Sequence, residues 1–399
     1  MRRALNWETP DSKDPDRGRR ERSMVNPRLL CCSEPSCRER PSGKTIKPVQ
    51  SNEHTTTMRP TPRSTAELDR LISEPGPEVI RAVEQCPGTY AVLGAGGKMG
   101  FHTSLMLQSA LHELGHSDAV MTVSRFGSSE SRKQFEDAGF RVVAADLSDP
   151  QSVADLPLAD NIIFLAGVKF GTSNQPDMLQ RMNVDMPKLV AEHYRTARIV
   201  ALSTGCVYSF TTPESGGATE DSEVDPPGDY ARSCRGREAA FEAAADTCGT
   251  RSSLIRLNYS IDLRYGVLVD IAQKVRACQP VNVEMGYANV IWQGDAIAQT
   301  IQSLPHASAP PFVVNITGPN VLRIRVIANM FADRFGCQPI IEGDEQATAW
   351  LSSAAKAQAM FGEPGVSLTQ MVHWIADWLE QGGETLGKPT HFEVRSGSY

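Results

Sequence analysis

The sequence predicts an α/β fold in which helices cover both faces of a parallel β-sheet, with a smaller C-terminal lobe. Short apolar runs typical of buried strands alternate with longer segments of helical periodicity. The first of these runs, Tyr90–Leu93, passes directly into a glycine cluster and then into an apolar helical pattern that reaches Leu114. Strands that alternate with helices in this way form a doubly wound parallel sheet.

The glycine cluster after the first strand has the spacing expected of a phosphate-binding turn. Glycines let the backbone turn sharply and approach a pyrophosphate, which then lies on the free N–H groups of the following helix. The alternative is a structural turn that binds no ligand. The residues predicted to meet a dinucleotide here are Gly94, Gly96, Gly97, Lys98, Met99 and Gly100.

Composition excludes several classes of function. The 399-residue chain carries a net charge of −7, which argues against a general nucleic-acid or membrane-surface binder. No run approaches the roughly 18 apolar residues of a membrane helix, and no secretory signal is visible. The nine cysteines are scattered and complete no zinc spacing, so we predict no metal site and reduced thiols in the cytoplasm.

Residues 1–57 differ in composition from the rest of the chain. They hold twelve Lys and Arg against eight Asp and Glu, and few large apolar side chains. Such a segment cannot bury enough surface to offset its ordering entropy. We expect either a disordered tail or a start assigned too far upstream, with Met58 as the natural first residue.

The remaining elements follow in order. A lead-in helical segment occupies 58–86 and is interrupted at Pro75-Gly76-Pro77. The sheet domain is expected over 87–257, with strands returning near 288–316, and the substrate lobe and tail over 258–287 and 317–399. Further strands are predicted at 119–124, 141–147, 161–167, 198–203 and 252–257, and helices at 177–195, 230–245 and 366–380.

The end of the second strand bears on the choice of cofactor. Dinucleotide folds that bind NAD place an acidic residue there to hold the ribose 2′-hydroxyl, whereas an arginine accommodates the 2′-phosphate of NADP. This chain has Ser124-Arg125 instead of an acid. We therefore predict NADP, with NAD as the alternative if Arg125 is only a solvated loop charge.

Taken together, these segments resemble the extended short-chain dehydrogenase/reductase family, the nucleotide-sugar epimerases and dehydratases, over about residues 88–380. The resemblance implies a Rossmann fold, Thr204 and Tyr230 as catalytic residues, and cofactor contacts near the other motifs. The matching motifs are the glycine turn, Asp146-Leu147, Leu165-Ala166-Gly167, Asn183-Val184, Ser203-Thr204 with Val207-Tyr208, Tyr230, Arg256-Leu-Asn258 and Val290–Asp295.

One position departs from the family pattern. Four residues after Tyr230 the family has a lysine that holds the nicotinamide ribose and lowers the tyrosine pKa, and this chain has Cys234. A free tyrosine has a pKa near 10 and is a poor base at neutral pH. Three interpretations stay open: working chemistry assisted by Arg237 or by the charge of the cofactor, weak activity, or a binding protein without turnover.

The resemblance also implies a reaction. Tyr230 would exchange the proton of a sugar hydroxyl, Thr204 would bond the same oxygen, and the nicotinamide would carry the hydride. Dehydratases of the family have Asp-Glu after the threonine, but Gly205-Cys206 follows here, so 4,6-dehydration is not expected. Cys206 is a candidate acid/base, or simply a small core residue.

The second lobe is expected to hold the substrate. Its candidate substrate contacts are Asn258, Tyr259, Arg264 and Trp292. The alternatives are that the arginine is only paired with an acidic residue and that the aromatic side chains lie in the core. The tail Lys388–Arg395 could pack over the site or across a dimer. A homodimer through helices 177–195 and 230–245 is expected by analogy.

The sequence thus predicts an NAD(P)-dependent oxidoreductase or epimerase acting on a sugar or nucleotide-sugar hydroxyl or keto group, with an atypical Tyr-x-x-x-Cys motif. The alternative is a catalytically impaired NAD(P)-binding sensor or scaffold.

Overall fold

The computed structural model describes residues 58–169, 171–172 and 175–397. The predictions for residues 1–57 lie outside this range. Of the described helices, none is long and apolar enough to cross a membrane.

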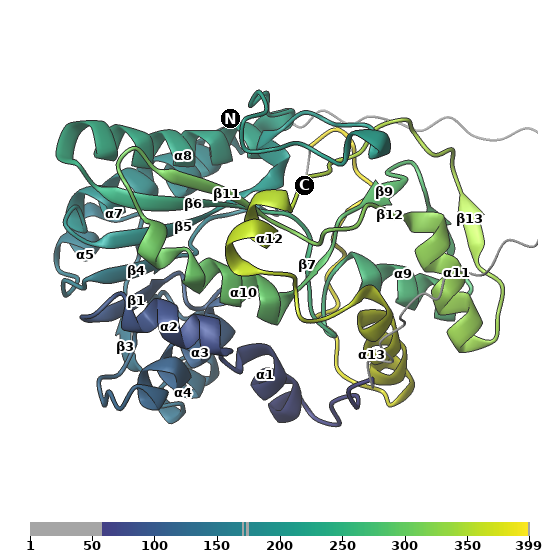
Figure 1. Ribbon diagram of the computed structural model, residues 1–399, viewed down its shortest axis with the longest axis horizontal. Helices are drawn as coiled ribbons and strands as arrows, with labels where there is room; N and C mark the ends of the chain where they lie inside the picture. Colours follow the sequence, from purple (N-terminus) through teal and green to yellow (C-terminus); the bar gives the residue numbers. More distant parts are fainter. Residues whose placement is uncertain (1–57, 170, 173–174, 398–399) are drawn as a thin grey trace, which may run out of the picture. The chain divides into compact units, whose positions relative to one another are not determined.

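A seven-stranded parallel sheet forms the centre of the molecule (Figure 1), as predicted. Its strand order is β11-β6-β5-β4-β1-β2-β3, so the order reverses between β1 and β4. A ligand of such a sheet binds outside the carboxyl ends of the strands at this switch point. The strands are β1 Tyr90–Leu93, β2 Met121–Ser124, β3 Arg141–Ala144, β4 Asn161–Phe164, β5 Arg198–Thr204, β6 Arg251–Leu257 and β11 Phe312–Ile316.

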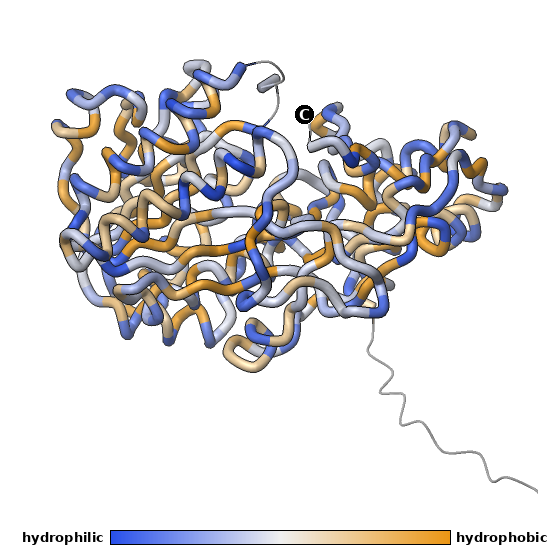
Figure 2. Tube along the Cα trace, turned by 90° about the horizontal axis from the view of Figure 1, so that it is seen from above, coloured by the Kyte–Doolittle hydropathy of each residue, from blue (hydrophilic) through white to orange (hydrophobic). Residues whose placement is uncertain are grey.

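Alternate side chains of each inner strand enter two different apolar cores. In β4, Ile163 packs on one face of the sheet, whereas Ile162 and Phe164 pack on the other. Both faces are covered, so every residue of β1 and β4 is buried. Figure 2 shows stretches of hydrophobic residues, in orange, running through the interior of the molecule.

Two sets of helices cover these faces. One face carries α5 Pro150–Ala154, α7 Met186–His193 and α8 Gly228–Cys248. The other carries α1 Thr65–Ser73, α2 Pro77–Glu84, α3 Gly100–Glu113, α4 Ser129–Asp137, α10 Gln293–Gln302 and α12 Ala355–Phe361.

The second lobe is built on three helices, and its core is continuous with the apolar core on the sheet face that α3 covers. Their buried side chains join one apolar cluster with that face of the sheet. The helices are α9 Val267–Arg276, α11 Ile324–Phe335 and α13 Leu368–Glu380. The short strands pair as β7 Ser260–Ile261 with β10 Ile291–Trp292, β9 Tyr287–Ala288 with β12 Leu322–Arg323, and β8 Pro280–Asn282 with β13 Ile340–Glu342.

Two predicted helices are subdivided. The lead-in segment is two helices, because Pro77 begins α2 at a position where its missing N–H costs nothing. The predicted helix 177–195 consists of α6 Pro176–Leu179, a π-helical turn Gln180–Asp185 and α7. The π-turn contains Asn183, and such turns are frequent at functional sites.

A buried ion pair joins α8 to the carboxyl ends of the strands. Glu238 of α8 accepts hydrogen bonds from Arg256 of β6 at 2.8 and 3.0 Å and from Ser203 of β5 at 2.6 Å. Arg256 also donates to Tyr208, which donates to Asn315 of β11. The Glu238 side chain has no exposed surface. This network fixes α8 against three neighbouring strands.

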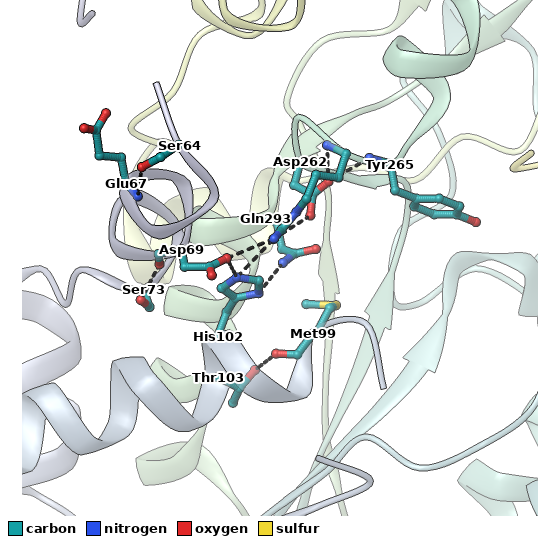
Figure 3. A network of polar contacts seen from close by, with 11 residues as sticks. Ser64, Glu67, Asp69, Ser73, Met99, His102, Thr103, Asp262, Tyr265 and Gln293 are labelled. Atoms are coloured by element: carbon teal, nitrogen blue, oxygen red, sulfur yellow. Dashed lines mark hydrogen bonds and ion pairs between the residues drawn. The ribbon is translucent and has the colours of Figure 1, made fainter. Parts of the chain in front are cut away.

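A second polar network holds the lead-in helix α1 on α3 (Figure 3). One oxygen of Asp69 lies 2.8 Å from His102 Nε2 and 3.0 Å from an Arg264 nitrogen. The amide nitrogen of Gln293 lies 3.1 Å from His102 Nδ1, and a second Arg264 nitrogen lies 3.2 Å from His102 Nε2. Burial raises the pKa of Asp69, but the His102 hydrogen bond and the Arg264 charge outweigh it, and the pKa falls below its ordinary value.

Replacing Glu238 tests the first network. Glu238→Gln leaves the Arg256 charge buried without its counter-ion, so we expect the free energy of unfolding to fall by about 3–5 kcal/mol in urea titrations. Glu242→Gln removes the half-exposed partner of Arg235 from the same helix and is expected to cost at most about 1 kcal/mol. Equal losses in the two variants would contradict the assignment.

The Asp69 network predicts a pH dependence. Asp69→Asn removes charge-assisted bonds and should lower the free energy of unfolding by about 1.5–3 kcal/mol at pH 7. Because folding depresses the Asp69 pKa, this contribution is present above its ordinary value of 3.8 and is lost as the pH falls through the lower, folded value. Urea titrations from pH 7 downward should show the gap between wild type and variant closing, and a gap that stays constant would refute the account.

Candidate active site

One cavity lies at the predicted switch point of the sheet. It has a volume of about 380 Å³ and is bounded by the glycine turn, the ends of β2 and β3, and the loop after β4. Of the predicted cofactor residues it brings together Gly94, Gly96, Gly97, Arg125, Asp146, Leu147, Ala166 and Gly167.

The glycine turn is shaped so that side chains would not fit. Gly94 has φ of 86°, and a Cβ there would lie 2.6 Å from the backbone nitrogen of Ala166. At Gly96 a Cβ would lie 2.6 Å from the hydroxyl oxygen of Ser124, and at Gly100 it would overlap the backbone of Ala95. The turn therefore keeps its backbone open toward the cavity, and α3 begins directly behind it, which suits a pyrophosphate.

Two charged groups face each other across this cavity. Arg125 follows β2 and Asp146 follows β3, and both line the space. Hydrogen bonds from Ser148 lower the pKa of Asp146, and the charge of Arg125 lowers it further. The cavity is thus lined by one cation and one ionised carboxylate.

A second cavity adjoins the first and contains the predicted catalytic residues. It has a volume of about 280 Å³ and shares Leu165 and Gly167 with its neighbour. The predicted residues on its walls are Gly167, Ser203, Thr204, Cys206, Tyr230, Asn258 and Tyr259. The two cavities together form one cleft along the carboxyl ends of β1, β4, β5 and β6.

Thr204 ends strand β5 and its side chain begins the next turn. Its hydroxyl accepts a hydrogen bond from the backbone N–H of Cys206 at 3.2 Å, which fixes the rotamer. Cys206 lines the same cavity. A threonine hydroxyl held in this way can still donate its own proton to an oxygen in the cleft.

Tyr230 lies in the first turns of α8, where burial raises the pKa of its phenol well above 10. The thiols of Cys234, which is hydrogen-bonded to the phenol, and of Cys206 raise this pKa further, whereas Arg237 lowers it. Burial likewise raises the pKa of the Cys234 thiol.

Asn183 fixes the loop that follows β4. Its side-chain oxygen accepts bonds from the Val168 N–H at 2.9 Å and from Arg237 at 2.8 Å, and its nitrogen donates to the Val168 carbonyl and to Ser233. All of its amide hydrogen-bonding capacity on both atoms is used. Asn183 therefore holds the loop after β4 and lines neither cavity, and its direct contact with the cofactor stays a prediction.

Other predicted residues lie outside the two cavities. Lys98 contacts the ring of Tyr265 and the carbonyl of Ser260, both on the second cavity. Met99 is a buried residue before α3, and Trp292 packs in the core against Trp374. Arg264 forms ion pairs with Asp69 and Asp262, which is the structural alternative to a substrate contact. Ser203, by contrast, lines the second cavity, but its hydroxyl donates to the buried Glu238.

The side chains on the second cavity that were not among the predicted site residues include Lys169, Tyr265 and Thr390. Lys169 follows the matched loop Leu165-Ala-Gly167 by two positions, and its ammonium nitrogen lies 5.6 Å from the centroid of the Tyr230 ring. Only proximity in sequence to that loop could have signalled it, because its partner is 61 positions away.

The C-terminal tail reaches this cavity, where Thr390 lines the wall. It runs from α13 into the space between the sheet and the second lobe (Figure 1). Thr390 donates twice to Asp270 of α9, at 2.7 and 2.6 Å, and Arg395 donates to the Thr348 carbonyl. The tail thereby supplies a wall of the cavity on the side of the second lobe.

Comparison with known proteins agrees with this architecture. Residues 90–259 match the model of the NAD dependent epimerase/dehydratase family. The predicted resemblance is thus confirmed over this segment. No curated protein sequence matches significantly.

Solved structures share the fold at low sequence identity. A UDP-galactose 4-epimerase is 21% identical, with a TM-score of 0.58, over 74% of this chain and 99% of its own. The UDP-glucuronic acid 4-epimerase of Bacillus cereus, solved with UDP-glucuronic acid and NAD, is 17% identical, with a TM-score of 0.60, over 73% and 99%. The dTDP-glucose 4,6-dehydratase DesIV of Streptomyces venezuelae, a double mutant with NAD bound, is 18% identical, with a TM-score of 0.61, over 73% and 96%.

Proposed function

We propose, from the match of residues 90–259 to the NAD dependent epimerase/dehydratase family, that this protein is an NAD(P)-dependent oxidoreductase or epimerase acting on the hydroxyl or keto group of a sugar or nucleotide sugar. The observation that carries the proposal is the cleft itself, in which Thr204 and Tyr230 face a cavity that continues into the glycine turn.

The residues divide the work of the reaction. The nicotinamide, when bound, supplies or accepts the hydride. Tyr230 exchanges the proton of the substrate oxygen, and Thr204 holds that oxygen by a hydrogen bond. Asn258 and Tyr259 form the substrate wall. Tyr259 has φ of 39°, a strained conformation for a non-glycine residue, and such strain persists where the surroundings impose it, often at active sites.

The rival proposal is an NAD(P)-binding sensor or scaffold without turnover. The observation that favours it is Cys234, which places a second thiol instead of an ammonium beside the Tyr230 phenol. Both proposals require cofactor binding. Only the enzyme requires a change in nicotinamide absorbance when a substrate is added. Assembly as a homodimer, and location in the cytoplasm, stay predictions.

The enzyme proposal predicts a selective loss in Tyr230→Phe. Removing the hydroxyl removes general acid–base catalysis, so kcat should fall by about 10²–10⁴ while the cofactor Kd stays within about twofold. Nicotinamide absorbance with a panel of sugars and nucleotide sugars measures the first, and cofactor fluorescence the second. Tyr194→Phe, a buried tyrosine bonded to Pro157 away from the cleft, should keep wild-type kcat. A wild type that binds cofactor but turns over no member of the panel would favour the sensor.

We propose NADP as the preferred cofactor, because Arg125 is the cation beside the predicted ribose site and no acid follows β2. Arg125→Ala should weaken NADP binding by about 10- to 100-fold, the worth of a charge-assisted hydrogen bond, and leave NAD binding nearly unchanged. Isothermal titration with both cofactors measures this. Lys133→Ala, which removes a nearby exposed charge paired with Asp137, serves as the control. Equal weakening for both cofactors would refute the preference.

A further inference from the structure

The buried phenol of Tyr230 presents an electrostatic problem that the sequence left open. Burial disfavours its ionised form, and the two neighbouring thiols, Cys206 and Cys234, add to that effect. An ion in a low-dielectric site needs a nearby opposite charge. The question is which cation of this chain supplies it in place of a lysine at position 234.

Arg237, the candidate from sequence, is already engaged by other groups. It donates to the Leu202 carbonyl at 2.7 Å and to the Asn183 side-chain oxygen at 2.8 Å. These bonds tie its planar guanidinium to the end of β5 and to the π-turn. Arg237 therefore contributes a fixed charge at the wall of the cavity, and its replacement would also release Asn183 and the loop that Asn183 holds.

Lys169, on the loop after β4, places its ammonium group over the ring of Tyr230. It lines the same cavity as Tyr230, and its Nζ lies 5.6 Å from the centroid of the tyrosine ring. Its backbone is positioned by Val168, which exchanges two hydrogen bonds with Asn183. Burial lowers the pKa of Lys169 and the thiols of Cys206 and Cys234 raise it, so the ammonium itself gains from an anionic neighbour.

We propose that Lys169, carried on the loop after β4, supplies the positive charge that stabilises the Tyr230 phenolate, in place of a lysine at position 234. Lys169 is thus a positioning residue that acts through Tyr230, and its catalytic meaning rests on the proposed function. With the 5.6 Å between Nζ and the ring centroid taken as the charge separation, and an effective dielectric constant of about 20, a unit charge shifts a pKa by about two units. The other titratable or charged groups on the cavity or bonded to the phenol are Cys206, Cys234, Arg237, Tyr259 and Tyr265.

The direct test measures the ionisation of the phenol without any substrate. Incorporating 3,5-difluorotyrosine at position 230 of the full-length protein gives a more acidic phenol, whose titration is followed by ¹⁹F NMR. Lys169→Met, and independently Lys169→Gln, should raise the measured pKa by about two units. Lys169→Arg keeps the charge and should shift it by less than half as much.

A matched control removes a different lysine that packs on an aromatic ring. Lys356 lies 4.5 Å from the centroid of Phe312, away from the cleft, and Lys356→Met should leave the Tyr230 titration unchanged. An unchanged titration in both Lys169→Met and Lys169→Gln would overturn the proposal. So would an equal shift in Lys356→Met.

Rescue from the other side of the phenol completes the experiment. Adding Cys234→Lys to Lys169→Met places an ammonium on α8 and should return the pKa of the fluorinated phenol to within about half a unit of its starting value. A double variant that stays at the Lys169→Met value would contradict a purely electrostatic role. A protein that shows the shift and rescue but no nicotinamide turnover would keep the Lys169 assignment and lose the proposed function.

Discussion

The cleft depends on the ion pair between Glu238 and Arg256, buried where α8 meets the carboxyl ends of β5, β6 and β11. Burial of two charges is tolerated only when they lie close to each other and hydrogen bonds satisfy their remaining donors and acceptors. Ser203 and Tyr208 supply the remaining hydrogen bonds of this ion pair. A shift of α8 along the sheet would therefore separate the buried carboxylate of Glu238 from Arg256. Because Tyr230 lies eight residues before Glu238 on the same helix, the pair also fixes the position of the phenol relative to Thr204.

Buried hydrogen bonds also fix the loop that follows β4. Asn183 joins Val168, Ser233 and Arg237, and so it ties the π-turn, the loop and α8 into one unit. Gly167 must be glycine in this arrangement, since a Cβ there would run into Arg237 and approach Asn183. The shape of the cavity therefore depends on residues behind its wall as well as on the residues that line it.

The periphery closes the site from two directions. Asp69, His102 and Arg264 hold the lead-in helix α1 on α3, next to the glycine turn (Figure 3). The tail is fastened to α9 through Thr390 and Asp270 and forms part of the catalytic cavity. A substrate of the proposed reaction would accordingly fit a space bounded by the second lobe and by Thr390 of the tail.

The sequence by itself determined the sheet, the glycine turn, and the placement of Thr204, Cys206 and Tyr230 on one cavity, because strand–turn–helix order places such residues at one edge of a parallel sheet. It did not determine the partners of Arg264, the burial of Trp292, the indirect role of Asn183, or the approach of Lys169 to Tyr230. These depend on contacts between residues far apart in the chain, and local periodicity carries no record of which side chain meets which. Only the tertiary structure decided that the ammonium group of Lys169, on the loop after β4, lies over the ring of Tyr230.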